Sequence, residues 1–379
     1  MRQCRPDDET PRIAYIVPMQ SAVLTAERTF TAPAPTPRAA DDTTMIREAA
    51  RLTRDLNVPR AAIFWGDLAL SAGLGYAALA VVIGAASPWL MLAAGVVAIL
   101  ALYRAGSFIH ELTHLKPNAV PGFRTGWNLL LGVPLLVPSF MYEGVHNLHH
   151  ARTRYGTADD PEYLPLALMK PVKLLVFIGV SAIAPIVLLL RFGVVAPLSL
   201  VIPGLRRIVV ERYSALSINP AFRRKAPEGA VARDWLVWES LASLWAIALI
   251  AGVATGMVPL GSFAIFLTVA SGVAVLNQVR TLVAHLWEND GDPISVTAQY
   301  LDTVNVPPPG LLPALWAPVG LRYHALHHLL PGVPYHALGE AHRRLAAGLP
   351  QTSAYHAANY AGLGGLVVRL VGGSLRASR

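Results

Sequence analysis

The sequence predicts an all-α integral membrane protein in which four transmembrane helices form two hairpins and a cytosolic helical cap holds a metal site. Three observations support this prediction: an apolar composition, two pairs of long apolar segments and three clusters of histidine. Hydrophobic residues make up 54% of the 379-residue chain and charged residues only 14%, whereas about 25% of the residues of a soluble domain are charged. This deficit of charge favours a protein embedded in a lipid bilayer.

Four apolar segments are each about long enough to cross the bilayer as a helix. They come in two pairs, and the members of each pair are separated only by turn residues, Ser87 and Pro88 in the first pair and the residues around Pro259 in the second. A connection this short joins antiparallel neighbours, so each pair should form a hairpin. The four segments are residues 68–86, 89–109, 240–258 and 260–279.

Basic residues set the expected orientation of the two hairpins. Neither hairpin tip carries Lys or Arg, while the flanking segments carry several. Because loops rich in Lys and Arg stay in the cytosol, both tips should face away from it. The histidine clusters and both chain termini are then expected on the cytosolic side. The flanking basic residues are Arg51, Arg54, Arg60, Arg104, Lys116, Arg233 and Arg280.

Two further apolar segments fit a full crossing less well. Residues 127–142 and 174–203 are interrupted by prolines, and we expect both segments to be interfacial or re-entrant. Residues 1–45 mix polar residues with Pro and Ala without a sustained period, which is typical of a disordered tail, here cytosolic. Residues 46–379 should form a single membrane domain.

Twelve histidines are present, and eight of them fall into three clusters. Within each cluster the spacing of three or four residues places side chains on one face of a helix. We therefore expect each cluster to present all of its imidazoles to one point. The clusters are His110 with His114, His146 with His149 and His150, and His324 with His327 and His328.

The clusters indicate metal binding, whereas isolated histidines such as His336, His342 and His356 are expected to be packed or surface imidazoles. The single cysteine, Cys4, allows neither an intramolecular disulfide nor a thiolate metal site. Eight or nine imidazoles exceed the three or four protein ligands of one zinc ion, so two metals are implied. Imidazole nitrogen suits Fe, Zn, Cu and Ni, and the ligand type alone leaves the metal open.

Other functions use fewer of these residues. His110, Glu111 and His114 match the HExxH pattern of zinc metalloproteases, but this interpretation leaves the other two clusters without a role. A metal transporter should carry its histidines within the spans rather than at or beyond their cytosolic ends. The net charge of +8 is scattered between apolar segments, so membrane lipids or an acidic protein are better candidate partners than nucleic acid.

The order and spacing of the clusters, HxxxH, HxxHH and HxxHH, resemble the membrane fatty acid desaturase superfamily over about residues 60–350. The segments 155–165 and 329–336, which follow the second and third clusters, are also similar to that family. The resemblance implies two iron ions, O2 as co-substrate, a fatty-acyl or other lipid substrate, and the eight clustered histidines as iron ligands. Stearoyl-CoA desaturase-like enzymes place a further histidine at the end of the fourth span, which implies His285 as a ninth ligand.

The reaction that the resemblance implies is the introduction of a C=C bond into an alkyl chain, and we expect a desaturase. Membrane di-iron hydroxylases, ketolases and alkane monooxygenases share the ligand set and remain the alternative. The sequence has no His-Pro-Gly-Gly stretch that would mark a fused cytochrome b5 domain. A separate ferredoxin or cytochrome b5-like protein should therefore supply the electrons.

Residues near the clusters complete the expected site. Polar side chains there should accept hydrogen bonds from the free N–H of metal-bound imidazoles, and the candidates are Glu111, Asp159, Asp160 and Asn289. An apolar tunnel should hold the substrate chain, since each methylene left in water costs about 0.8 kcal/mol. The candidate lining residues are Trp127, Phe140, Met141 and Tyr142.

Overall fold

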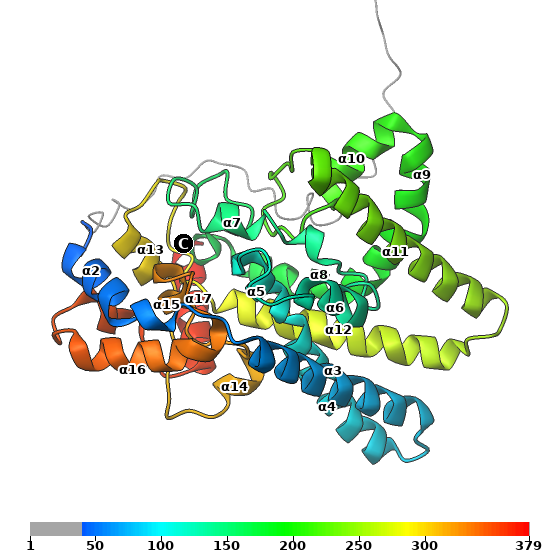
Figure 1. The fold of residues 1–379 in the computed structure, drawn as a ribbon, viewed down its shortest axis with the longest axis horizontal. Coiled ribbons are helices and arrows are strands. Elements are labelled where there is room, and N and C mark those ends of the chain that lie inside the picture. Colours follow the sequence, from blue (N-terminus) through cyan, green and yellow to red (C-terminus); the bar gives the residue numbers. More distant parts are fainter. Residues whose placement is uncertain (1–39, 379) are drawn as a thin grey trace, which may run out of the picture.

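The structure is a computed structural model and describes residues 40–378 (Figure 1). These residues form helices joined by turns and loops, and the only strand-type pairing among them consists of isolated bridges. The all-α fold class predicted from the sequence is therefore confirmed. Two long hairpins, α3 with α4 and α11 with α12, extend to one side of the molecule, and shorter helices gather at their opposite ends (Figure 1).

The first predicted hairpin consists of α3 (Ala61–Gly84) and α4 (Pro88–Gly106). Ser87 caps α4 because its hydroxyl accepts a hydrogen bond from a backbone N–H of the first turn. The two helices approach closely at Gly75, where a Cβ would lie 2.7 Å from the side chain of Leu102. A small residue is thus required at the helix contact, as is common where membrane helices pack.

The second predicted hairpin consists of α11 (Gly229–Ala254) and α12 (Leu260–Leu282). The turn between them includes Gly256, whose φ of +76° lies in the left-handed region that favours glycine. Both helices are longer than the predicted apolar segments, because backbone hydrogen bonding continues through turns that contain charged residues, where an uninterrupted apolar segment ends. α12 packs against α4 and α8, which joins the two hairpins into one bundle.

The segment predicted to be re-entrant begins with α8 (Pro171–Leu190) and continues through a π-helical turn, η5 (Arg191–Val195), into α9 (Ala196–Val201). α10 (Pro203–Tyr213) then packs against α9. Five helices of the described residues are long and apolar enough to cross a membrane, and the run Pro171–Val201 is one of them. The chain therefore makes a long helical run at this position, with Pro185 accommodated inside it.

Contacts on either side of this segment favour four crossings rather than five. The backbone N–H of Leu216, after α10, donates to the carbonyl of Met141, before α8, at 2.8 Å, and that of Ile218 donates to Pro161 at 3.0 Å. Both ends of the segment therefore lie on the same side of the bundle. α10 spans only about 16 Å, too short to recross a hydrocarbon core of about 30 Å. We expect the segment to enter the membrane and return, and the number of crossings stays a prediction.

Residues 127–142, also predicted to be interfacial, fold as short helical pieces rather than as one helix. The side chain of Asn128 holds the pieces together, since it donates to the hydroxyl of Ser139 and accepts from the backbone N–H of Ser139, both at 2.8 Å. The pieces are α6 (Phe123–Trp127), the π-helical turn η2 (Asn128–Gly132) and the 3-10 turn η3 (Ser139–Met141).

The remaining helices form a cap over the inner ends of the hairpins (Figure 1). Met45 of α2 and Leu345 of α16 are fully buried in its apolar core. α2 begins at Thr43, slightly before the predicted boundary of the membrane domain, and residues 1–39 of the predicted tail lie outside the described residues. The cap elements are α2 (Thr43–Leu52), η1 (Arg54–Leu56), α5 (Phe108–His114), α7 (His146–His149), η4 (Leu166–Leu168), α13 (Val296–Asp302), α14 (Pro313–Trp316), α15 (His324–Leu329), η6 (Tyr335–Ala337), α16 (Leu338–Gly348), η7 (Ala354–Ala358) and α17 (Leu363–Ala377).

Candidate metal centre

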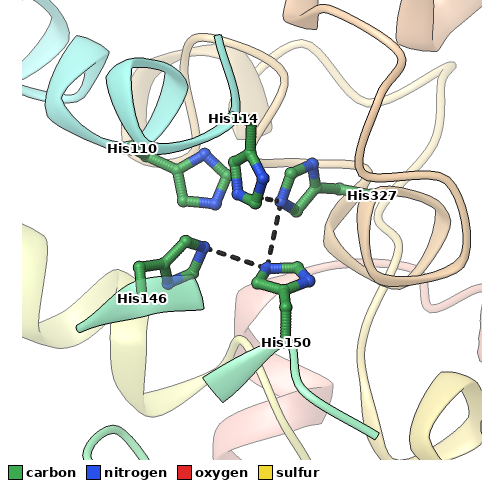
Figure 2. Close-up of side chains that lie close together, drawn as sticks. All are labelled: His110, His114, His146, His150 and His327. Carbon is green, nitrogen blue, oxygen red and sulfur yellow. Dashed lines mark hydrogen bonds between the residues drawn. The ribbon is translucent and has the colours of Figure 1, made fainter. Parts of the chain in front are cut away.

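Nine histidines converge beneath the cap in two groups. Within each group, one ring nitrogen of every histidine lies within 4.8 Å of those of all the others. The first group consists of His110, His114, His146, His150 and His327, and the second of His149, His285, His324 and His328 (Figure 2). The structure thus brings together all nine histidines predicted as ligands, while their binding of metal stays a prediction.

The second and third sequence clusters are each divided between the two groups. The expectation that every cluster presents all its imidazoles to one point is therefore wrong for these two. Histidines four residues apart, His146 with His150 and His324 with His328, stay together, while the intervening histidine joins the other group. Successive helical residues are rotated by about 100°, so positions i+3 and i+4 point in directions that differ by that angle. Each of α7 and α15 can in this way serve two sites.

In the first group, the Nε2 atoms of four rings point toward one another (Figure 2). Those of His146 and His150 lie 2.9 Å apart, and that of His327 lies 3.1 Å from His114 and 3.2 Å from His150. The ring of His110 packs beside His146 and His327, with centroid distances of 4.5 and 4.4 Å. α5, α7 and α15 each contribute, so the group exists only in the folded chain.

His285, just beyond the end of α12, belongs to the second group. Its Nε2 lies 3.2 Å from that of His324, and its ring meets those of His149 and His328 edge-on at centroid distances of 5.1 and 5.3 Å. An isolated antiparallel bridge to Thr303 fixes its backbone. The fourth long helix thus delivers a buried imidazole to the site.

Two carboxylates, the buried Asp160 and the half-buried Glu162, orient rings from outside the groups. Nδ1 of His146 lies 2.9 Å from a carboxylate oxygen of Glu162, and Nδ1 of His149 lies 2.9 Å from one of Asp160. A carboxylate accepts but cannot donate when ionised, so it draws the ring proton to Nδ1. The lone pair of each Nε2 is then directed into the group.

A third carboxylate acts through a tyrosine. The hydroxyl of Tyr155 donates to Asp302 at 2.8 Å and lies 2.8 Å from Nδ1 of His285. Because this hydroxyl gives its proton to the carboxylate, it accepts one from the imidazole and leaves Nε2 of His285 free for a metal. Tyr163 donates to the same carboxylate. Burial raises the pKa of Asp302 to about 7. The hydrogen bonds from the two tyrosines act in the opposite direction, and so help to keep the carboxylate ionised near neutral pH.

Burial also determines the charge of the imidazoles. It lowers the pKa of His146, His150 and His285 well below the ordinary value, and the same holds for the three histidines of α15. These six rings are therefore neutral at pH 7, which is the form that binds metals. At His149, burial lowers the pKa and the Asp160 carboxylate raises it, with a net rise.

The donor set fits a pair of metal ions. Among the described residues, no hydrogen-bond partner meets the buried Nε2 atoms of His110 and His328. A buried polar atom without a partner costs about 1–3 kcal/mol. Several neutral Nε2 atoms directed at one another also repel unless a cation lies between them. Two cations, one in each group, would satisfy both conditions.

The four polar residues predicted beside the ligands have different roles. Asp160 is fully buried and contacts His149. Glu111 is buried beside His110 but accepts a hydrogen bond from the backbone N–H of Tyr335. This contact, and the five-histidine group around its neighbours, argue against the metalloprotease interpretation. The two remaining residues lie outside the ligand contacts of the described chain: Asp159 is exposed, and Asn289 binds the carbonyl oxygens of Gly156 and Asp292.

The four residues predicted to line a substrate tunnel lie in three different surroundings. Trp127 packs among α3 to α6 and donates its indole N–H to the carbonyl of Ala105. Phe140 and Met141 are buried in an apolar cluster with residues of α8 and α11. Tyr142 instead stacks on the ring of His146 and donates a hydrogen bond to Glu162 at 2.7 Å, so it contacts one candidate ligand and the carboxylate that orients it.

The isolated histidines lie away from both groups, as expected. His336 accepts a backbone hydrogen bond from Arg60, and His342 lies 2.7 Å from the hydroxyl of Tyr355 within the cap. His356 packs beside the ring of Tyr355. None of the three belongs to a candidate metal group of the described residues.

Sequence reasoning missed Glu162, Tyr155 and Asp302. The first two lie in segment 155–165, which was noted only for its similarity to the desaturase superfamily. Glu162 could have been predicted, because it lies two residues after Asp160 in the same turn. From there its carboxylate reaches His146, while Asp160 contacts His149. Asp302 could not have been predicted, since 147 positions separate it from Tyr155 and only the fold brings the two side chains together.

Comparison with known proteins agrees with this geometry. The family model described as fatty acid desaturase matches residues 86–359. A protein of Caulobacter vibrioides described as a ceramide hydroxylase is 49% identical over 326 residues, which cover 86% of this chain and 93% of that protein. No solved structure matches the chain. The chain therefore belongs to the fatty acid desaturase family of membrane oxidoreductases.

Proposed function

We propose that this protein is a di-iron hydroxylase that uses O2 to convert a C–H bond of a ceramide-type lipid into C–OH. The observation that carries the proposal is the convergence of nine buried imidazoles in two groups. Desaturation, which we expected from the sequence, and hydroxylation share this ligand set. The similarity to a protein described as a ceramide hydroxylase supports the hydroxylase alternative instead.

The proposed reaction is balanced by an external electron donor. A lipid C–H bond, one O2, two electrons and two protons give C–OH and one water. A separate ferredoxin or cytochrome b5-like protein would supply the electrons. Iron, bound by both histidine groups, would supply the redox chemistry that splits O2 and oxidises the C–H bond.

The chain itself fixes the ligands and keeps the site dry. Glu162, Asp160 and the Tyr155 hydroxyl hold protons at Nδ1 of three rings, so each Nε2 presents a lone pair to the metal without rearrangement. Six of the nine histidines are buried and the other three are half-buried. Exclusion of bulk water protects the oxidising site from side reactions.

We place the lipid chain in the membrane part of the molecule. Phe140 and Met141 lie in an apolar cluster that reaches α8 and α11, and Tyr142 connects this cluster to His146. A chain held there would present a methylene to the histidine groups from the membrane side. Both groups, and both chain termini, would face the cytosol, where the electron donor can dock.

The test is lipid profiling in a host that makes ceramides. Cells expressing the wild-type chain should accumulate a lipid that carries one added oxygen atom. Cells expressing His146→Ala should lack it, while His356→Ala, outside both groups, should retain it. A new lipid lacking two hydrogens would instead support desaturation, and no change in either lipid would contradict both functions.

A further inference from the structure

One basic side chain lies buried beside the histidine groups without a partner. Arg280, in the last turn of α12, is 8% exposed. Its side chain makes no hydrogen bond and no ion pair with any residue in the described range 40–378, and its Nη2 atom is wholly buried. Arg191, the other buried arginine of these residues, contrasts with it because Glu239 neutralises it at 2.7 Å.

The location of Arg280 makes its unpaired state unfavourable. After burial, its charge is a further cause of the lowered pKa of His285, His324 and His327, so the guanidinium lies close to both groups. Two bound metal ions would add positive charge to the same region. The Glu162 carboxylate attracts the guanidinium but forms no ion pair or hydrogen bond with it in the described residues. A buried cation is normally paired directly or absent. Its presence therefore calls for a ligand that accepts hydrogen bonds.

The chemistry of guanidinium limits what that ligand can be. Arginine offers five N–H donors and no acceptor, so the ligand must present an acceptor oxygen. Arg280 lies at the inner end of a long apolar helix, where a lipid's polar part meets its alkyl chains. An alkyl chain has no acceptor, whereas a ceramide-type lipid has an amide carbonyl.

We propose that Arg280 is a positioning residue that donates a hydrogen bond to the amide carbonyl of the lipid substrate. This inference rests on the proposed function for the identity of the lipid. It also has a chemical consequence: with the carbonyl held beside the histidine groups, the carbon that is oxidised lies within a few bonds of the amide rather than in the middle of an alkyl chain.

The test measures binding and turnover with two lipids. The first is a ceramide, and the second is the same lipid with its amide oxygen replaced by sulfur, a weaker hydrogen-bond acceptor. Wild-type protein should bind the ceramide at least about 10-fold more tightly than it binds the thioamide, as expected for a hydrogen bond from a charged donor. Arg280→Met should bind both lipids equally and weakly. Arg207→Met, which removes an exposed arginine of α10, should discriminate like the wild type.

Two further readouts separate positioning from a structural role. Arg280→Met should keep the metal content and thermal stability of the wild type, because it removes an unpaired buried charge. Arg280→Lys keeps a cation but loses the planar guanidinium, so its preference for the ceramide over the thioamide should be intermediate. The same variant replaces Arg280→Met in the test if the methionine variant cannot be purified. Wild-type discrimination in both variants, or loss of metal from Arg280→Met, would overturn the inference.

The same experiment distinguishes this inference from the proposed function. If the wild type discriminates between the lipids and Arg280→Met does not, the inference stands even when no hydroxylated product forms. If the wild type hydroxylates the ceramide while Arg280→Met discriminates as before, the function stands and the inference fails. A product hydroxylated in the middle of an alkyl chain would likewise contradict the position assigned to the carbonyl.

Discussion

The Nε2 atoms of His285 and His324 lie 3.2 Å apart although 39 positions separate the two residues along the chain. His285 belongs to none of the three histidine clusters of the sequence, and the fold delivers it from the end of α12. With it, the second group has four members and the first has five. A two-metal site therefore depends on a residue outside the three histidine clusters of the sequence.

His285→Ala should lower bound metal and abolish turnover, since it removes one of the four nitrogen ligands of the second group. His342→Ala is the matched control, because this histidine bonds to Tyr355 in the cap and lies outside both groups. Elemental analysis of the purified variants and lipid mass spectrometry would measure the two effects. Full metal content and wild-type product yield in His285→Ala would show that it is not a ligand.

Separate depletion of the two groups is expected from their geometry. His114→Ala removes a ring of the first group only, and His328→Ala removes a ring of the second group only. Each variant should keep about one metal ion per chain, because the remaining group retains its oriented ligands. Both should lose hydroxylation. Loss of all metal from either single variant would indicate that the groups do not bind independently.

The adjacent residues Asp159 and Asp160 offer a matched test of ligand orientation. Asp160→Asn weakens the acceptor that holds the proton on Nδ1 of His149, and loss of such a partner typically lowers metal affinity about 10- to 100-fold. Asp159→Asn changes an exposed carboxylate and should leave affinity unchanged. Competition titration with a metal chelator would compare them. Equal affinities in the two variants would contradict the role of Asp160.

Single cysteines introduced in a Cys4→Ser background test the topology. Met257→Cys at the tip of the second hairpin, where the native side chain is 77% exposed, should be labelled only from the side opposite the cytosol. Ala347→Cys in the cap should be labelled only from the cytosol. Val201→Cys, at the end of the α8 to α9 run, should behave like Ala347→Cys if this segment enters and returns. Labelling of Val201→Cys together with Met257→Cys would establish a fifth crossing.

The hairpins could be predicted because a span must be apolar along its whole length, and hydropathy measures this directly. Residues 260–279, for example, lie within α12, whose end at Leu282 extends them by only a few residues. α11 begins at Gly229, much earlier than predicted. Its first turns carry three charged residues, Arg233, Asp234 and Glu239, so the uninterrupted apolar segment in the sequence begins only after them. Residues 174–203 were predicted to be interfacial or re-entrant because prolines interrupt them, but Pro185 lies inside a continuous helix.

The histidines could be predicted from spacing, but their division between two groups could not. The spacing of His146, His149 and His150 fixes only their relative directions on α7. Which metal each ring faces depends on how α5, α7 and α15 pack, and this is set by distant residues. Arg280 illustrates the same limit. The sequence marked it only as a flanking charge that orients the hairpin, whereas its burial beside the ligands emerges only from the fold.

The most direct test of the central claim is turnover of a ceramide under 18O2 by purified protein loaded with iron and supplied with a one-electron donor. The account predicts a lipid product that carries one 18O atom as a hydroxyl group near the amide, and no product from His285→Ala. A product that lacks two hydrogens and contains no 18O, or a hydroxyl oxygen derived from water, would contradict it.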